Sequence, residues 1–152
     1  MADIVAPEVR SRMMSRIRGR DTRAEVTLRK GLFARGFRYR VNDKRLPGSP
    51  DIVFPKWGAV IFVHGCYWHR HPGCPKAYMP KSRVDFWQAK FDENIRRDQR
   101  NIRNLLQTGW RVAVVWECAV IPELQPQSLD AIAAFLTSDV KYVELPREAT
   151  EK

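Results

Sequence analysis

Long hydrophobic runs and an acidic excess are both missing from this 152-residue chain. Its apolar runs are short, such as AVIFV at residues 59–63, and none approaches the roughly 20 residues of a membrane span. Residues 1–12 also lack the apolar centre of a signal peptide. We therefore expect a cytoplasmic protein with no membrane partner, formed by one domain that is long enough to bury a core.

Cysteine and histidine are scarce, with three residues of each type. In a reducing compartment, cysteines are expected to be metal ligands or free thiols rather than disulfides. All the histidines and all but one of the cysteines fall within HGCYWHRHPGC, residues 64–74. This crowding indicates a structural metal clip, a catalytic centre, or both.

The charge is strongly positive, with 27 Lys and Arg against 17 Asp and Glu. Residues 1–40 alone carry 11 basic and 4 acidic side chains, a difference of +7. Arginine binds phosphate and guanine with two parallel hydrogen bonds, so this clustering favours a nucleic-acid partner over a merely solvated basic surface. Residues 7–18 are predicted to form a short basic helix in an N-terminal arm of about 20 residues.

The periodicity predicts an α/β fold, with helices around a mixed central sheet. Thr22 and Glu25 form a capping-box pattern that begins a helix ending near residue 36. The other predicted helices span residues 82–107 and 129–136, and the predicted strands span residues 37–41, 51–54, 59–63 and 111–116. We expect one domain over residues 1–146, followed by a flexible polar tail at 147–152.

A structural zinc site needs four ligands, which are mostly thiolates with some imidazole. Taking all the thiols and one histidine gives Cys66, His71, Cys74 and Cys118. His71 and Cys74 have the spacing of a tight chelating turn, although spacing alone leaves His69 as an alternative. Cys118 taken alone is better explained as a small core residue, whereas Cys66, His71 and Cys74 together favour metal binding.

The remaining histidines fit a phosphodiester-cleaving site. The hairpin predicted from the turn at residues 56–58 brings Asp51 towards the end of strand 59–63, beside His64. An aspartate can hold Mg²⁺ while an imidazole such as His69 activates or orients water. Glu25 could add a carboxylate, but Asp51 as a turn residue and Glu25 as a cap are equally good explanations for each residue alone.

Aromatic side chains next to this site suggest contacts with bases. Tyr67 and Trp68 lie between expected metal ligands, where a core position is difficult to arrange, so they fit a stacking or intercalating wedge. Trp87 falls on the apolar stripe of the long predicted helix, which favours core packing. Met14 lies on the basic N-terminal helix, as part of an apolar docking face or as a second wedge.

These motifs resemble the very short patch repair (Vsr) mismatch endonucleases over nearly the whole chain. The resemblance rests on SRMMSRIRGRDTRAE, LPGSPDIVF, VIFVHGCYWHRH, FWQAKFDENIRRDQRN and GWRVAVVWEC, in this order. It implies a fold like that of type II restriction endonucleases with an added structural zinc. It also implies nicking of DNA 5′ of the thymine in a T:G mismatch left by deamination of 5-methylcytosine. The strand after Asp51 has no carboxylate or lysine, so histidines would replace these groups.

The resemblance also implies roles for single residues. Mg²⁺ would be held by Asp51 and the backbone carbonyl of Val63, and His69 would act on the nucleophilic water. His64 and Glu25 would hold metal-bound water or phosphate oxygens, with Asp98 as a supporting acid. The implied zinc ligands are Cys66, His71, Cys74 and Cys118, and the implied DNA wedge consists of Tyr67, Trp68, Trp87 and Met14.

Two other functions remain open at this stage. One is a restriction-like endonuclease with another sequence specificity, and the other is a zinc-stabilised DNA-binding module without catalysis. For the leading hypothesis we expect a monomer associated with the nucleoid, whose partners are mismatched double-stranded DNA and other DNA repair proteins.

Overall fold

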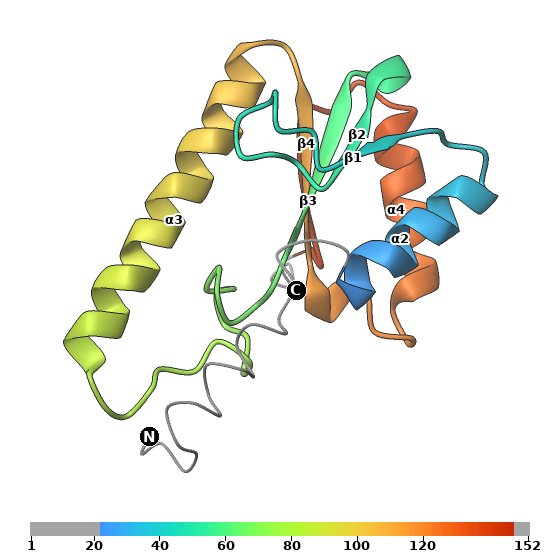
Figure 1. Ribbon diagram of the computed structural model, residues 1–152. Coiled ribbons are helices and arrows are strands. Elements are labelled where there is room, and N and C mark those ends of the chain that lie inside the picture. Colours follow the sequence, from blue (N-terminus) through green and yellow to red (C-terminus); the bar gives the residue numbers. More distant parts are fainter. Residues whose placement is uncertain (1–21, 148–152) are drawn as a thin grey trace, which may run out of the picture.

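The computed structural model describes residues 22–147, which form three layers with a sheet between helices (Figure 1). Met14, the expected basic helix and residues 148–152 of the expected tail lie outside the described residues. None of the helices within 22–147 has both the length and the apolar character needed to cross a membrane.

The central sheet is mixed, as the sequence predicted. Its five strands lie in the order β1-β2-β3-β4-β5. The strands are β1 (Arg40–Val41), β2 (Ile52–Phe54), β3 (Ala59–His64), β4 (Arg111–Trp116) and β5 (Tyr142–Leu145). The first three pair antiparallel, whereas β3, β4 and β5 run parallel, and the register places His64 opposite Trp116. The carboxyl ends of β3 and β4 therefore lie side by side.

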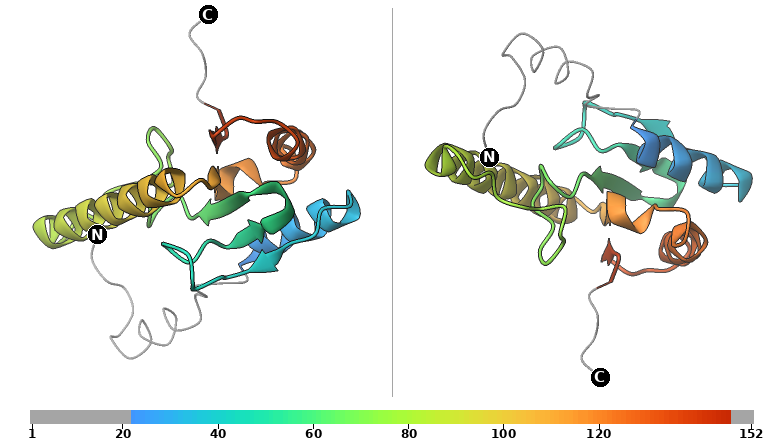
Figure 2. Two further views of the ribbon diagram at one scale, coloured as in Figure 1. Left: turned by 90° about the horizontal axis from the view of Figure 1, so that it is seen from above. Right: turned by 90° about the horizontal axis from the view of Figure 1, so that it is seen from below.

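The helices divide between the two faces of the sheet. Helices α2 (Arg23–Ala34) and α4 (Gln125–Leu136) cover one face, and α3 (Val84–Gln107) lies against the other (Figures 1 and 2). Short 3₁₀ helices η1 (Pro55–Trp57) and η2 (Glu117–Ala119) follow β2 and β4. Helix α3 connects the parallel strands β3 and β4, as such a pair requires.

Each face of the sheet has its own hydrophobic core, because successive strand residues point to opposite faces. Ile61 and Ala113 face Leu28 and Ile132 of the α2–α4 layer. Their strand neighbours, such as Val60 and Val112, instead face the other core, which contains Leu105 of α3. The strands β2, β3 and β4 are thus buried on both faces, which explains their nearly continuous apolar sequences.

The structure corrects several predicted boundaries. The strand predicted at residues 37–41 is reduced to Arg40–Val41, and β5 was not predicted at all. Helix α4 begins at Gln125 rather than near residue 129, since Pro126 fits its first turn, where the missing N–H has no helical partner. Helix α3 begins at Val84, which is 43% exposed because the first turns of α3 extend beyond the sheet (Figure 2).

Candidate active site and metal-ligand cluster

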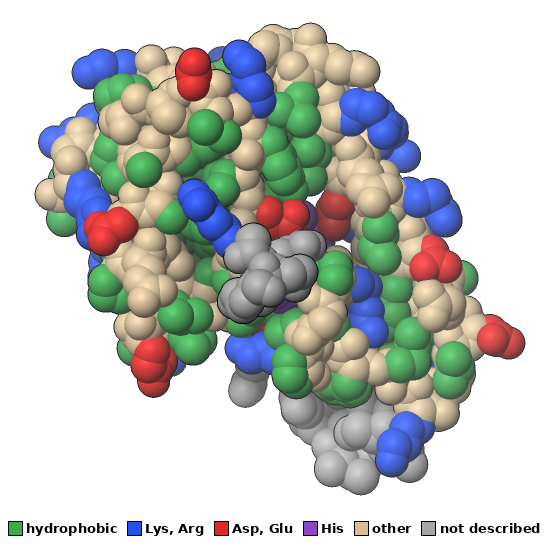
Figure 3. Space-filling model, turned by 180° about the vertical axis from the view of Figure 1, so that it is seen from behind, with side chains coloured by type: hydrophobic (Ala, Val, Ile, Leu, Met, Phe, Trp, Pro, Cys, Tyr) green, Lys and Arg blue, Asp and Glu red, His purple; other side chains and the backbone are tan. Residues whose placement is uncertain are grey.

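A cavity of about 1060 Å³ opens at the carboxyl end of β3. Its walls come from α2, from the loop that precedes β2, from residues 62–69 and from the middle of α3. The space-filling view shows a hollow flanked by hydrophobic side chains, with acidic and histidine side chains at its base (Figure 3). This cavity contains every residue expected to perform chemistry, from Glu25 to Asp98.

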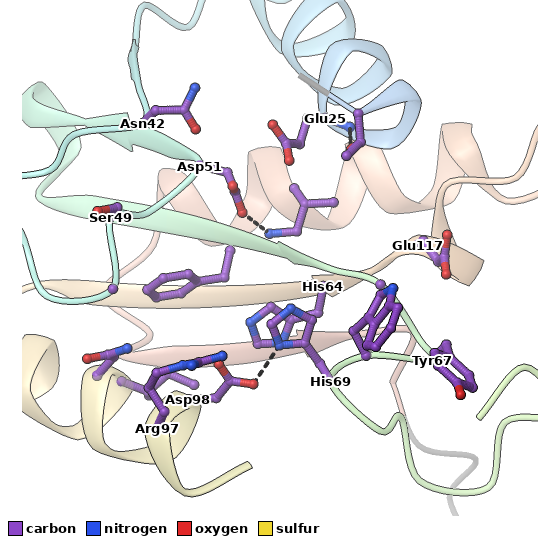
Figure 4. Close-up of a pocket in the computed structure, with 18 of the residues that line it drawn as sticks. Glu25, Asn42, Ser49, Asp51, His64, Tyr67, His69, Arg97, Asp98 and Glu117 are labelled. Carbon is purple, nitrogen blue, oxygen red and sulfur yellow. Dashed lines mark hydrogen bonds and ion pairs between the residues drawn. The ribbon is translucent and has the colours of Figure 1, made fainter. Parts of the chain in front are cut away.

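A pair of carboxylates forms one side of the cavity. Oδ2 of Asp51 accepts a hydrogen bond from the Val63 backbone N–H at 2.6 Å (Figure 4). Glu25 is only 2% exposed. Its backbone N–H donates to the Thr22 hydroxyl in the expected cap, while its carboxylate lines the cavity. Helix capping and a place in the site are therefore compatible for Glu25.

The environment of Asp51 disfavours its negative charge. Burial raises the pKa of Asp51 to about 7, against the lowering effect of the Val63 hydrogen bond and with a further rise from neighbouring Glu25. A carboxylate pair in such a place would be stabilised by a cation, and hard oxygen ligands suit Mg²⁺. The donor set therefore fits the expected magnesium ion.

Two histidines face the carboxylates from the other side. The imidazoles of His64 and His69 stack with centroids 4.0 Å apart and ring planes 3° apart. Nδ1 of His69 lies 2.6 Å from Oδ2 of Asp98 in α3 (Figure 4). A neutral His69 that donates through Nδ1 keeps Nε2 as its acceptor, which is the arrangement of a general base held by a carboxylate.

His64 has a different environment from His69. It is 6% exposed, and its Nδ1 has no hydrogen-bond partner among the described residues. Burial lowers the pKa of His64 to about 3, with a further lowering by His69. His64 is therefore neutral at physiological pH.

Ligand atoms of His64, His69 and Asp98 all lie within 4.8 Å of one another. The stacked rings nevertheless suit a shared ion poorly, because the imidazole lone pairs lie in two parallel ring planes and cannot converge on one point. The His69–Asp98 pair is better arranged for moving a proton than for holding a metal.

A second cluster consists of the four expected zinc ligands, Cys66, His71, Cys74 and Cys118, whose ligand atoms lie within 4.8 Å of one another. Nδ1 of His71 is 3.6 Å from Sγ of Cys66 and 3.4 Å from Sγ of Cys118. A tetrahedral zinc ion separates sulfur and nitrogen ligands by about 3.6 Å, given its usual bond lengths. The donor set and its spacing therefore fit zinc.

Burial favours the uncharged forms of the side chains in this cluster. Burial raises the pKa of Cys66 to about 12 and also raises the pKa of Cys118. Burial lowers the pKa of His71, which favours the neutral imidazole that binds metals. Metal binding here would release protons from the thiols.

The backbone of residues 65–71 directs neighbouring histidines to the two clusters. The His69 N–H donates to the Gly65 carbonyl at 3.1 Å, and the His71 N–H donates to the Cys66 carbonyl at 3.0 Å. Arg70 between them has a φ of +58°. Spacing in the sequence left His69 as an alternative zinc ligand, and the structure places His71 with the cysteines and His69 with Asp98.

Trp116 at the end of β4 separates the two clusters. Its ring stacks on His71 at 4.4 Å and meets His64 edge-on at 5.1 Å. Its indole N–H donates to Oε2 of Glu144 in β5 at 2.6 Å. The same indole therefore fixes one imidazole of each cluster.

The expected aromatic wedge residues of the described chain are in mutual contact. Trp68 lies 4.9 Å from Tyr67 and 6.2 Å from Trp87, measured between ring centroids. All three are partly exposed, so Trp87 is not the core residue that helical periodicity favoured. Tyr78 and Phe86 extend this aromatic group and are 57% and 48% exposed.

Three polar residues of the site were not predicted from the sequence. Asn94 of α3 is 7% exposed and donates to the Trp68 carbonyl at 3.2 Å. Glu117 accepts from the Cys66 N–H at 2.9 Å, and Arg70 contacts the aromatic group. Only Asn94 carried a usable signal, since it lies one helical turn before Asp98.

Paired carboxylates facing a histidine–aspartate pair across an open cavity are typical of metal-dependent hydrolases that act on phosphodiesters. Comparison with known proteins narrows this class. Residues 2–84 match the family model described as "DNA mismatch endonuclease Vsr".

Curated relatives agree with this match. The chain is 49% identical over 118 residues to "Type II nicking enzyme V.XorIIP" of Xanthomonas oryzae pv. oryzae (strain KACC10331 / KXO85), covering 78% of this chain and 86% of that protein. It is 44% identical over 120 residues to "DNA mismatch endonuclease Vsr" of Escherichia coli (strain K12), covering 79% and 76%. It is 33% identical over 129 residues to "Type II nicking enzyme V.HpaIIP" of Haemophilus parainfluenzae, covering 84% and 92%.

The chain belongs to the Vsr family of DNA mismatch endonucleases. It is accordingly an endodeoxyribonuclease, and the resemblance seen in the sequence is confirmed.

Proposed function

We propose that this chain is a Mg²⁺-dependent endonuclease that nicks DNA 5′ of the thymine in a T:G mismatch. Such mismatches arise by deamination of 5-methylcytosine, and the nick would initiate very short patch repair. The observation that carries this proposal is the single cavity in which Asp51 and Glu25 face the His69–Asp98 pair, with Tyr67 and Trp68 on the adjoining loop.

In this proposal Asp51 and the backbone carbonyl of Val63 hold Mg²⁺, which, when bound, offsets the negative charge that develops on the phosphodiester. The raised pKa of Asp51 supports this role, because a buried carboxylate beside another carboxylate gains from a cation.

His69 is the proposed general base. Its Nε2 accepts a proton from the attacking water, and Asp98 holds the ring through Nδ1 and stabilises the imidazolium that forms. His64 and Glu25 orient water or a phosphate oxygen. The neutrality of His64 supports an orienting role, since it can hydrogen-bond in the site without competing for the transferred proton.

The proposed zinc ion holds residues 66–74 to the end of β4 through Cys66, His71, Cys74 and Cys118. The proposed wedge of Tyr67, Trp68 and Trp87 enters the DNA stack beside the mismatch, where partly exposed rings can replace lost base stacking. Met14, which lies outside the described residues, would enter from the opposite groove. The basic surface would hold the DNA backbone.

We also propose that the architecture is that of type II restriction endonucleases. The support is local: Asp51 directly precedes β2, which pairs antiparallel with β3, and the other neighbour of β3 is the parallel strand β4. A monomer is sufficient for this proposal, because one chain carries the carboxylates, the histidines and the wedge.

The decisive experiment is a nicking assay on end-labelled duplexes that carry T:G, other mismatches or normal pairs in several sequence contexts. With Mg²⁺, we expect a single nick 5′ of the mismatched thymine, which EDTA or Asp51→Asn abolishes. The control is Asp139→Asn, the same substitution at an exposed position, and this variant should nick DNA as the parent protein does. Absence of cleavage on every T:G duplex would refute the proposed substrate.

A second candidate is a restriction-related nicking enzyme that recognises a paired sequence. It is favoured by several relatives that are named Type II nicking enzymes. Cleavage of fully paired duplexes in the same assay would support it. Tight binding without cleavage of any duplex would instead indicate a DNA-binding module without catalysis.

A further inference from the structure

Arg70 occupies an unusual backbone conformation between a residue of each cluster. Its φ of +58° lies in the left-handed region, which non-glycine residues seldom adopt. Such strain persists only where surrounding contacts fix it, and it concentrates at functional sites. Here the contacts that fix it come from the Arg70 side chain itself.

The Arg70 guanidinium connects its own loop to Ala77 and to Phe91 in α3. It donates to the Tyr67 carbonyl at 3.0 Å and to the Ala77 carbonyl at 2.9 Å. The Cζ atom of Arg70 lies 3.9 Å from the ring centroid of Phe91 in α3 and 5.3 Å from the ring centroid of Tyr67. Phe91 is 1% exposed, so this group is anchored to the packed part of α3.

No carboxylate within residues 22–147 forms an ion pair with Arg70. Its charge is instead directed at carbonyl oxygens and aromatic faces, which only a planar cation with several donors can satisfy together. A lysine has the same charge but offers neither the flat face nor the fork of donors.

We propose that Arg70 is a positioning residue that holds Tyr67 and Trp68 in their DNA-binding arrangement before DNA is bound. This inference rests on the proposed function, because the ordered loop would serve to insert Tyr67 and Trp68 beside a mismatch. A loop that is already ordered loses less conformational freedom on binding, which increases affinity without any new contact. Arg70 thus acts through Tyr67 and not on the scissile phosphate.

Arg70→Lys is the test, and Arg38→Lys is its matched control. Arg38 also lies over a ring, 4.1 Å from the Phe33 centroid, and donates to the Phe33 carbonyl at 3.5 Å, but it is exposed and near the end of α2. Both substitutions preserve the net charge, so the non-specific electrostatic contribution to DNA binding is unchanged.

For Arg70→Lys we expect about 10-fold weaker binding to a T:G duplex, an effect of the size that lost preorganisation produces. Binding to the fully paired duplex should change less than about 2-fold, and single-turnover nicking at saturating protein should keep its rate. Hydrogen exchange at residues 67–77 should be faster than in the parent protein. Arg38→Lys should alter none of these quantities.

Three outcomes would overturn the proposal. Equal weakening on both duplexes would make Arg70 a direct DNA contact, and slower nicking with unchanged affinity would place its effect on His69. Unchanged exchange at 67–77 would show that Arg70 does not order the loop. If the parent protein fails to prefer T:G over paired DNA, the proposed function fails, while the exchange measurement still decides whether Arg70 fixes the loop.

Discussion

The two clusters of potential ligands in this protein share one loop but differ in almost every physical property. In the cysteine–histidine cluster, four ligand atoms from Cys66, His71, Cys74 and Cys118 approach a common point. In the carboxylate–histidine cavity the side chains face an open volume of about 1060 Å³, and the two imidazoles lie parallel. Structural metal sites use closed ligand sets, whereas catalytic sites leave room for water and substrate. This difference predicts that the cysteine–histidine cluster stabilises the fold and that the carboxylate–histidine cavity performs catalysis.

The largest effect should come from Asp51→Asn. We expect nicking to fall by about 1000-fold, because the substitution removes the charge that balances a cation in the site. Asp51 has a raised pKa, so its ionisation destabilises the metal-free protein as pH rises from about 4 to about 7. At pH 8 the metal-free variant should therefore be more stable by about 1–3 kcal/mol, measured by urea unfolding. Equal loss of stability and activity would contradict an active-site role.

Cys118→Ser tests the cysteine–histidine cluster. We expect the variant to bind zinc less tightly and to unfold at a lower temperature. Loss of a residue that only hydrogen-bonds to a metal ligand lowers metal affinity by roughly 10–100-fold, and loss of a ligand itself should lower it further. Metal content and melting temperature provide the measurements. His69→Ala is the informative counterpart, since it should lose nicking while retaining about one zinc per chain. A variant of Cys118 with full zinc content would remove Cys118 from the ligand set.

Asn94→Asp should produce an intermediate effect. Arg97 donates to Oδ1 of Asn94 at 3.0 Å, which leaves the amide N–H to hold the Trp68 carbonyl. Aspartate lacks that donor, so we expect about 10-fold slower turnover, the size of one lost buried hydrogen bond. The exposed Asn104→Asp change serves as the charge-matched control. If Asn94 and Asp98 hold the same loop, Asn94→Asp should slow turnover less in an Asp98→Asn background than in the parent protein. Additive effects of the two substitutions would contradict this shared role.

The smallest expected effect concerns His64, which should not titrate over the physiological pH range. Burial lowers the pKa of His64 to about 3, so its imidazole NMR signals should stay constant between pH 5 and pH 8. The neutral form is favoured in the folded state. His64 therefore contributes stability that is complete above its ordinary pKa of about 6.5 and is lost as pH falls towards 3. A His64 signal that titrates near pH 6.5 would contradict its buried environment.

Much of this organisation was predictable from the sequence, because its residues lie in compact motifs. The apolar patterns of β3 and β4 predicted buried neighbouring strands, and the crowded segment after His64 predicted interleaved clusters. Strand β5 was missed, since Tyr142 is exposed at the sheet edge and the strand has no buried alternation. Such edge strands have weak local signals.

The polar supports of the site were harder to predict, because each acts through a long-range contact. Asn94 and Trp68 are 26 residues apart, and Glu117 and Cys66 are 51 residues apart. Their partners are backbone groups, which carry no residue identity that a sequence pattern could match. Arg70 likewise contacts the Tyr67 carbonyl and the Phe91 ring, which no local sequence pattern specifies.

The interleaving of the two clusters restricts how the length of the segment from His64 to Cys74 can change. Between His64 and His71, one inserted or deleted residue would turn His69 away from Asp98 or His71 away from the cysteines. The Pro72–Gly73 turn is exposed, and a Cβ on Gly73 would meet no atom within 4 Å, although its φ is +73°. A change of length should therefore cost less in this turn than in the first eight residues, which supply side chains to both clusters.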